Sequence, residues 1–108
     1  MTVTNVTIPT IKAFCNLEPK AQALKPLEEA AEVFGVWQDI DHMSAAFGNV
    51  DVASAETICA LECDLMDEIA DCIQACANLA AMVGVSDLTE YMERCEERNR
   101  ERGRYGDE

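Results

Sequence analysis

Residues 54–84 read SAETICALECDLMDEIADCIQACANLAAMVG, and this stretch decides the fold. Its apolar residues recur at steps of three or four positions, which is the 3.6-residue period of an α-helix. At about 1.5 Å per residue, this helix spans roughly 45 Å. Asp51 or Ser54 is its predicted N-terminal cap, and Gly84 is its predicted end. The apolar positions are Ile58, Leu61, Leu65, Ile69, Cys72, Cys76, Leu79 and Val83.

A second long helix is predicted before this stretch. All three prolines of the chain lie in its first quarter, so residues 27–108 contain none. The helix is expected from Pro26 to about Phe47, with a first turn or two starting at Pro19 and a kink at Pro26. Residues 10–16 are compatible with a further short helix.

The chain is long enough for one domain. Ser86 is expected to cap a last helix that fades near Gly103. We therefore divide the sequence into an N-terminal segment over 1–18, a helical domain over 19–103 and a loose tail over 104–108.

The predicted fold class is an all-α bundle, because apolar stripes on long helices must be buried against one another. The apolar stripe of a 31-residue helix is longer than the rest of a 108-residue chain is expected to cover. We therefore expect the bundle to be completed by self-association, as a homodimer or a homotetramer, most simply through a two-fold axis.

The charge of the chain excludes several classes of partner. Asp and Glu number 21 against 8 Lys and Arg, which gives a formal net charge of −13. A nucleic-acid polymer or an anionic membrane surface needs a basic face, so neither partner is expected. The longest uncharged stretch, residues 72–86, is too short to span a membrane. The opening residues show no signal-peptide pattern, and the six cysteines fit a reducing compartment, so a cytoplasmic location is expected.

Acidic residues gather on both long helices. The first helix carries Glu28, Glu29 and Glu32, beside an apolar face formed by Leu24, Leu27, Ala31 and Phe34. On the second helix, Glu68 and Asp71 flank the apolar stripe. If the two apolar faces pack together, these acids converge. Solvated helix surface is the alternative interpretation, because acids at helix margins are usually exposed.

A converging set of carboxylates predicts a metal site. Like charges at close range raise one another's pKa values unless a cation neutralises them. Oxygen ligands without His or Cys favour Mg²⁺, with Mn²⁺ as an alternative. Such a site can bridge the protein to phosphate groups, which would let an acidic protein bind an anion. Zinc is disfavoured because the chain has no C-x-x-C pair and one histidine.

The runs Glu28-Glu29-Ala30-Ala31-Glu32 and Glu68-Ile69-Ala70-Asp71 resemble the E-E-x-x-E and E-x-x-D signature of MazG-like, all-α nucleoside triphosphate pyrophosphohydrolases. The tail after Met92 is similar to the basic, Asn-containing C-terminal stretch of many members. The 35 residues between Glu32 and Glu68 are more than these proteins usually have there.

The resemblance implies an Mg²⁺-dependent hydrolase that converts a nucleoside triphosphate to the monophosphate and pyrophosphate. By matching position, the metal ligands would be Glu29, Glu32, Glu68 and Asp71. Glu28 would be a further ligand or the base for the attacking water, so Glu28 and Glu29 are the catalytic candidates.

Further residues are candidates for contacts with the nucleotide. Arginines suit phosphate oxygens, although an exposed helix laced with salt bridges is an equal interpretation of their segment. Trp37 is expected either to stack on a nucleotide base or to pack in a core or subunit interface. Asn78 is expected either to hydrogen-bond to the edge of a base or to link two helices by hydrogen bonds. The predicted substrate contacts are Lys25, Trp37, Asn78, Arg98, Asn99 and Arg102.

A second class of function remains open from the sequence. A non-catalytic helical oligomer, acting as an adaptor or regulator, would retain the same fold without turnover.

Overall fold

A computed structural model describes residues 3–47 and 52–106 of the chain. It contains three helices, α1 (Pro19–Phe47), α2 (Val52–Met82) and α3 (Thr89–Glu101), and no strand within the described residues. The prediction of an all-α fold is confirmed. The predicted cap Asp51 and the side chains at the facing ends of α1 and α2 lie outside what the structure describes. The alternative cap, Ser54, is wrong, because α2 begins at Val52 and Ser54 therefore lies inside the helix.

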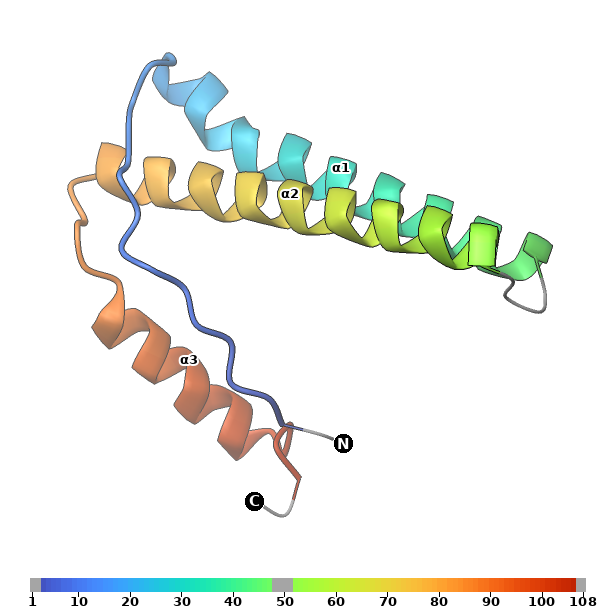
Figure 1. The fold of residues 1–108 in the computed structure, drawn as a ribbon. Coiled ribbons are helices and arrows are strands. Elements are labelled where there is room, and N and C mark those ends of the chain that lie inside the picture. Colours follow the sequence, from blue (N-terminus) through green and yellow to red (C-terminus); the bar gives the residue numbers. More distant parts are fainter. Residues whose placement is uncertain (1–2, 48–51, 107–108) are drawn as a thin grey trace.

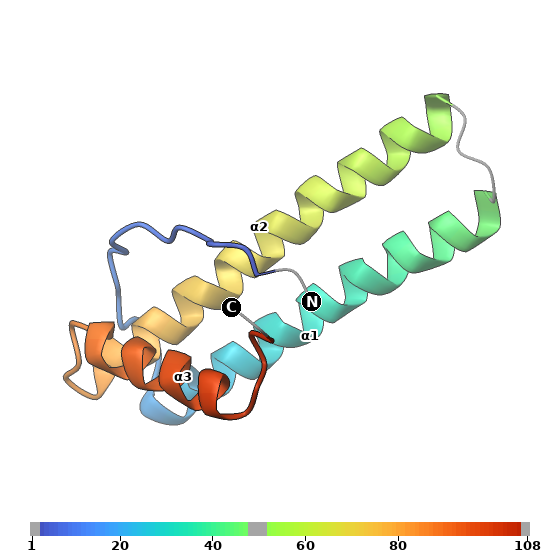
Figure 2. The same ribbon diagram turned by 90° about the horizontal axis from the view of Figure 1, so that it is seen from below.

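The two long helices form an antiparallel hairpin, and α3 lies apart from it (Figures 1 and 2). Helices α1 and α2 pack on each other, whereas no Cα atom of α3 comes within 8 Å of either long helix in the described part of the chain. The molecule is accordingly extended, measuring 49 × 41 × 21 Å with a radius of gyration of 17.3 Å. Among the described residues, no helix is both long and apolar enough to cross a membrane.

Helix α1 begins earlier than a start at Pro26 and includes the turns expected from Pro19. The backbone N–H of Gln22 donates to the Glu18 carbonyl at 2.9 Å, so Pro19 occupies the first helical position. Proline suits that position because its missing N–H would have no partner there. Pro26 lies inside the helix, where it leaves one carbonyl of the preceding turn without its usual partner.

The segment before α1 is extended. Residues 3–18 contain no helix, so the expected short helix over 10–16 is wrong. Its backbone instead crosses α2 near the C-terminal end of that helix, where the amide of Gln74 donates to the Lys12 carbonyl at 3.0 Å (Figure 1). Those backbone groups are bound by side chains of α2 and not by a helix of their own.

The face that α1 turns toward α2 differs from the expected one. Val33, Val36, Ile40 and Met43 are half-buried and share the α1 face that carries the buried Gln22. The stripe of Leu24, Leu27, Ala31 and Phe34, which was expected to pack, lies about 170° away at 100° per residue and is exposed. Helix α1 is therefore apolar on two opposite faces, and the described residues of this chain leave one of them exposed.

Helix α2 ends as the sequence predicts. Gly84 has φ +88°, and its N–H donates to the Ala81 carbonyl at 3.0 Å, while the N–H of Val85 donates to the Ala80 carbonyl at 2.9 Å. This pair of bonds is the Schellman motif, which satisfies the last carbonyls of a helix. Gly103, with φ +70°, ends α3 in the same way.

Asp87, rather than the expected Ser86, supports the start of α3. Its Oδ1 accepts the backbone N–H of Thr89 at 2.9 Å, and Leu88 at the cap position offers no side-chain bond. Hydrogen bonds from the side chain and then the backbone of Thr89 hold the pKa of Asp87 below its ordinary value.

We predict that Gly84→Ala lowers the free energy of unfolding by about 1 kcal/mol, because an L side chain is strained at this positive φ. A Cβ there would meet nothing within 4 Å, so the cost is conformational. Gly35→Ala is the matched control. It also meets nothing within 4 Å, but it lies inside α1 and is expected to stabilise by about 0.5–1 kcal/mol. Urea unfolding followed by circular dichroism measures both, and equal effects would contradict the prediction.

Candidate metal centre

Three carboxylates meet where α1 faces α2. One oxygen from each of Glu29, Glu68 and Asp71 lies within 4.8 Å of the other two. Glu29 comes from the inner face of α1, and the other two lie three residues apart on α2. Ligand oxygens around Mg²⁺ lie at most about 4.2 Å apart, given metal–oxygen distances of about 2.1 Å. The spacing of the three oxygens is therefore close to that of a ligand set.

Two of these carboxylates carry buried oxygens with no hydrogen-bond partner. Glu29 is 9% exposed, and its Oε2 is buried without a partner in the described part of the chain. The Oε2 of Glu68 is also buried and has no hydrogen-bond partner among the described residues. A buried carboxylate is costly unless something compensates its charge. A set of three carboxylates without His or Cys fits a hard divalent cation, so the residues present suit Mg²⁺ or Mn²⁺.

Lys25 partly neutralises this group. Its Nζ lies 3.4 Å from Glu29 Oε1 and 3.6 Å from Glu28 Oε2. The hydrogen bond and charge of Glu29, followed by the charge of Glu28, raise the pKa of Lys25 above its ordinary value. One ammonium therefore faces three clustered carboxylates, which leaves the group with an excess of negative charge.

A cavity of about 390 Å³ adjoins the acidic group. Its volume is within the range of small-ligand sites, about 300–1,000 Å³. Three parts of the chain line it: the N-terminal segment, the first turns of α1 and the C-terminal half of α2. The lining side chains are Phe14, Asn16, Leu17, Gln22, Lys25, Glu29, Asp71, Gln74, Ala75 and Asn78.

Asn78 attaches the N-terminal segment to α2. It is 4% exposed, and its Oδ1 accepts the Phe14 N–H at 2.9 Å and the Gln74 Nε2 at 2.8 Å. The Cys15 thiol also points to the Asn78 carbonyl oxygen, 3.6 Å away. The Asn78 side-chain oxygen is therefore occupied by the segment, and it neither joins two helices nor faces a ligand as an open acceptor.

Gln22 is a residue of this region that sequence reasoning missed. It is 1% exposed, and its Oε1 has no hydrogen-bond partner in the part of the chain that the structure describes. It lies seven residues before Glu29, which is two turns along the same face of α1. The seven-residue spacing from Glu29 would have placed Gln22 at the site, but only if the inner face of α1 had been known.

The remaining acids of the first helix do not join the group. Glu32 is exposed one turn beyond Glu29, and Glu28 is exposed with its carboxylate on Lys25. Trp37 is 48% exposed and stacks on Phe34 with ring centroids 5.8 Å apart. It does not line the cavity beside the acids.

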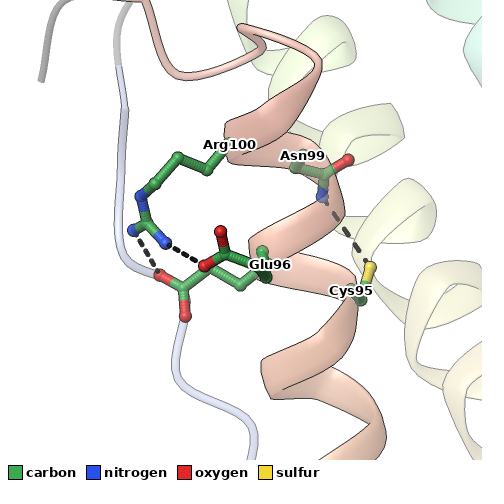
Figure 3. A network of polar contacts seen from close by, with 5 residues as sticks. Cys95, Glu96, Asn99 and Arg100 are labelled. Atoms are coloured by element: carbon green, nitrogen blue, oxygen red, sulfur yellow. Dashed lines mark hydrogen bonds and ion pairs between the residues drawn. The ribbon is translucent and has the colours of Figure 1, made fainter.

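The candidate phosphate-binding residues of the C-terminal region stay apart from the acids within one chain. Arg98 on α3 and Arg102 directly after it are exposed, and α3 contacts neither α1 nor α2 in the described residues. Asn99 donates to the Cys95 sulfur at 3.7 Å and accepts from Arg104 at 2.9 Å. Figure 3 shows Asn99 and Arg100 bonded to side chains of their own helix.

Comparison with known proteins gives no assignment. No protein-family model matches the chain, and no curated protein or solved structure matches it.

We predict that Asn78→Ala releases the N-terminal segment and lowers the free energy of unfolding by about 2 kcal/mol, because the Phe14 N–H and Gln74 amide lose a buried acceptor. Limited proteolysis should cut residues 3–18 faster, and hydrogen exchange at Phe14 should accelerate. Asn99→Ala is the control, because its amide bonds only within α3 and the following turn. Unchanged cleavage in Asn78→Ala would contradict the prediction.

Proposed function

We propose that this chain is a divalent-cation-dependent nucleoside triphosphate pyrophosphohydrolase of the MazG-like, all-α type. The observation that carries the proposal is the meeting of Glu29, Glu68 and Asp71 within 4.8 Å, with two buried oxygens that have no hydrogen-bond partner among residues 3–47 and 52–106. These are three of the four positions that the resemblance matches to metal ligands. Glu32, the fourth, is exposed one turn away on α1.

The adjoining cavity supports a substrate beside the cation. Glu29 and Asp71 belong both to the acidic group and to the cavity wall, so a ligand in the cavity would touch the ion's own ligands. An Mg²⁺ ion at this place supplies charge neutralisation for phosphoryl oxygens and lowers the pKa of a bound water. Lys25, at the rim of the same cavity, offers an ammonium to the same oxygens.

The proposed reaction consumes one water and gives a nucleoside monophosphate and pyrophosphate. Glu28 is the proposed base for that water on the resemblance alone, and its carboxylate contacts Lys25, which also contacts Glu29. The arginines of α3 enter this site only if another copy of the chain brings them, because α3 contacts neither long helix of its own chain among the described residues. A cytoplasmic, self-associated enzyme is part of the same proposal.

We predict that Mg²⁺ or Mn²⁺ raises the melting temperature relative to chelator. At ten times the dissociation constant, mass action adds about 1.4 kcal/mol, or roughly 6 °C for a domain of this size. Glu68→Gln should lose most of this rise, and without metal it should melt above the wild type because one repelling charge is gone. Scanning calorimetry measures both effects.

Asp67→Asn is the matched control for this experiment. It removes one charge from the neighbouring position of the same helix, where the side chain is exposed and outside the acidic group. It should keep the full metal-dependent rise. The assigned metal centre would be rejected if the metal raised the melting temperature of Glu68→Gln and Asp67→Asn equally. It would also be rejected if the metal did not raise the melting temperature of the wild type.

We further predict pyrophosphate release from one or more nucleoside triphosphates with Mg²⁺, lowered at least 100-fold in Glu68→Gln and unchanged in Asp67→Asn. Loss of one ligand removes several kcal/mol of stabilisation from developing phosphoryl charge, and each 1.4 kcal/mol is tenfold in rate. A coupled pyrophosphate assay over canonical and modified nucleotides measures this. Equal release by Glu68→Gln would reject the site.

A non-catalytic helical assembly is the second candidate, and the exposed apolar surface favours it. Leu27 is 69% exposed and Phe34 is 56% exposed on the outer face of α1. Cation binding without pyrophosphate release from any nucleotide would identify this second function.

A further inference from the structure

The buried amide of Gln22 has no task in holding the fold together. The side chain is 1% exposed, and its Oε1 has no hydrogen-bond partner within residues 3–47 and 52–106. A buried amide oxygen without a partner destabilises the folded chain, and an apolar side chain would avoid that cost. Gln22 also lines the cavity of about 390 Å³. A ligand in this cavity that donates a hydrogen bond to Gln22 removes the cost.

The cavity extends over two helical turns from the acidic group. Gln22 lies seven residues before Glu29 on α1, and Asn78 lies seven residues after Asp71 on α2. All four side chains line the cavity, and the two helices are antiparallel (Figure 1). Because seven residues rise about 10 Å, the cavity has an acidic end at Glu29 and Asp71 and an amide end at Gln22 and Asn78. A nucleotide whose phosphates bind at the acidic end places its base toward the amide end.

Apolar side chains of the N-terminal segment line the same cavity. Phe14 is 53% exposed and Leu17 is 41% exposed, although both belong to the cavity wall. A flat heteroaromatic ring covers such surface with its faces and carries its polar atoms at its edge. A phosphate or a sugar would leave the apolar surface uncovered. Apolar walls beside a buried amide therefore favour a nucleobase.

The amide end offers acceptors to a ligand. The Oδ1 of Asn78 already accepts the Phe14 N–H and the Gln74 Nε2. The Gln74 Nε2 donates at 2.8 Å to Asn78 and at 3.0 Å to the Lys12 carbonyl. An amide nitrogen has two hydrogens, so Gln74 has its oxygen left for a ligand. This oxygen and the Oε1 of Gln22 both require a donor.

We propose that the amide end binds a nucleobase that bears an exocyclic amino group, and that the Oε1 of Gln22 accepts a hydrogen bond from this group. Cytosine and adenine carry such a group, whereas uracil and hypoxanthine carry a carbonyl oxygen at the same place. Gln22 can rotate its amide to suit a carbonyl, but Gln74 is held by its two hydrogen bonds and still presents an oxygen. That the ligand is a nucleotide rests on the proposed function, and the choice of an amino-bearing base rests on these amide oxygens.

The test compares two pairs of nucleosides on the full chain without metal. Cytidine and uridine share a sugar and differ in an amino group against a carbonyl, and adenosine and inosine differ in the same way. None carries a phosphate, so their binding does not depend on the cation. Nuclear magnetic resonance titration of the Phe14 and Ala75 amides measures the affinities. The amino member of at least one pair should bind about tenfold or more tightly than its carbonyl partner, because the partner leaves a buried acceptor unpaired.

Gln22→Met should abolish most of this preference, because methionine has a similar length and no amide. It should melt at or above the wild type without ligand, since the unpaired buried oxygen is gone. Gln38→Met is the matched control, because it makes the same substitution on an exposed position of α1 that does not line the cavity. Gln38→Met and Glu68→Gln should both keep the preference.

Each contrary result overturns the assignment. Equal affinities within both pairs mean that the base edge is not read, and equal affinities that Gln22→Met abolishes mean that Gln22 contacts the shared sugar. No shift with any of the four nucleosides at millimolar concentration means that the cavity does not take a base. Loss of the preference in Gln38→Met means that the substitution acts on the helix and not on a contact.

The pyrophosphate assay separates this assignment from the proposed function. A preference for amino-bearing nucleosides without pyrophosphate release from any nucleotide rejects the enzyme and retains the base site. Pyrophosphate release with the same selectivity in the wild type and in Gln22→Met retains the enzyme and rejects the base site.

Discussion

The structure depends on the burial of polar side chains between α1 and α2. Apart from Ala75, the most buried described residues are Gln22, Glu29 and Asn78, all of which carry hydrogen-bonding groups. Such groups destabilise a helix interface unless each finds a partner. The side-chain oxygen of Asn78 accepts a hydrogen bond from the backbone of the N-terminal segment, and one of the two carboxylate oxygens of Glu29 pairs with Lys25. The buried oxygens that have no partner in the described part of the chain are where a ligand would contribute to folding as well as to chemistry.

This arrangement explains why the site and the fold are inseparable. If the inner face of α1 were apolar throughout, the hairpin would pack more tightly, and the acids would remain at its margin. With Glu29 in the interface, helix packing itself holds three carboxylates together, and it stores their mutual repulsion. A cation relieves that repulsion, so occupancy and stability are linked.

The sequence predicts the helices well and their faces less well. The 3.6 period of residues 54–84 and the positive-φ Gly84 are local signals, and both are seen in the structure. The inner face of α1 was not predictable, because Val33 and Val36 on one side and Leu27 and Phe34 on the other give two equally good stripes. Three of the four predicted ligands meet nevertheless, since Glu29 points inward from the first of these stripes. The N-terminal segment escaped prediction entirely, because its attachment uses backbone groups that no side-chain pattern reveals.

That attachment has a consequence for how such a cavity changes over time. Asn78 binds the backbone N–H of Phe14, and Gln74 binds the backbone carbonyl of Lys12. Any residue type supplies a carbonyl at position 12, and any type except proline supplies an N–H at position 14. The side chains of Asn16 and Leu17, which face the cavity, take no part in the anchor. Mutation can therefore alter the shape and polarity of this wall without loosening it, so ligand preference is free to diverge while the scaffold stays the same.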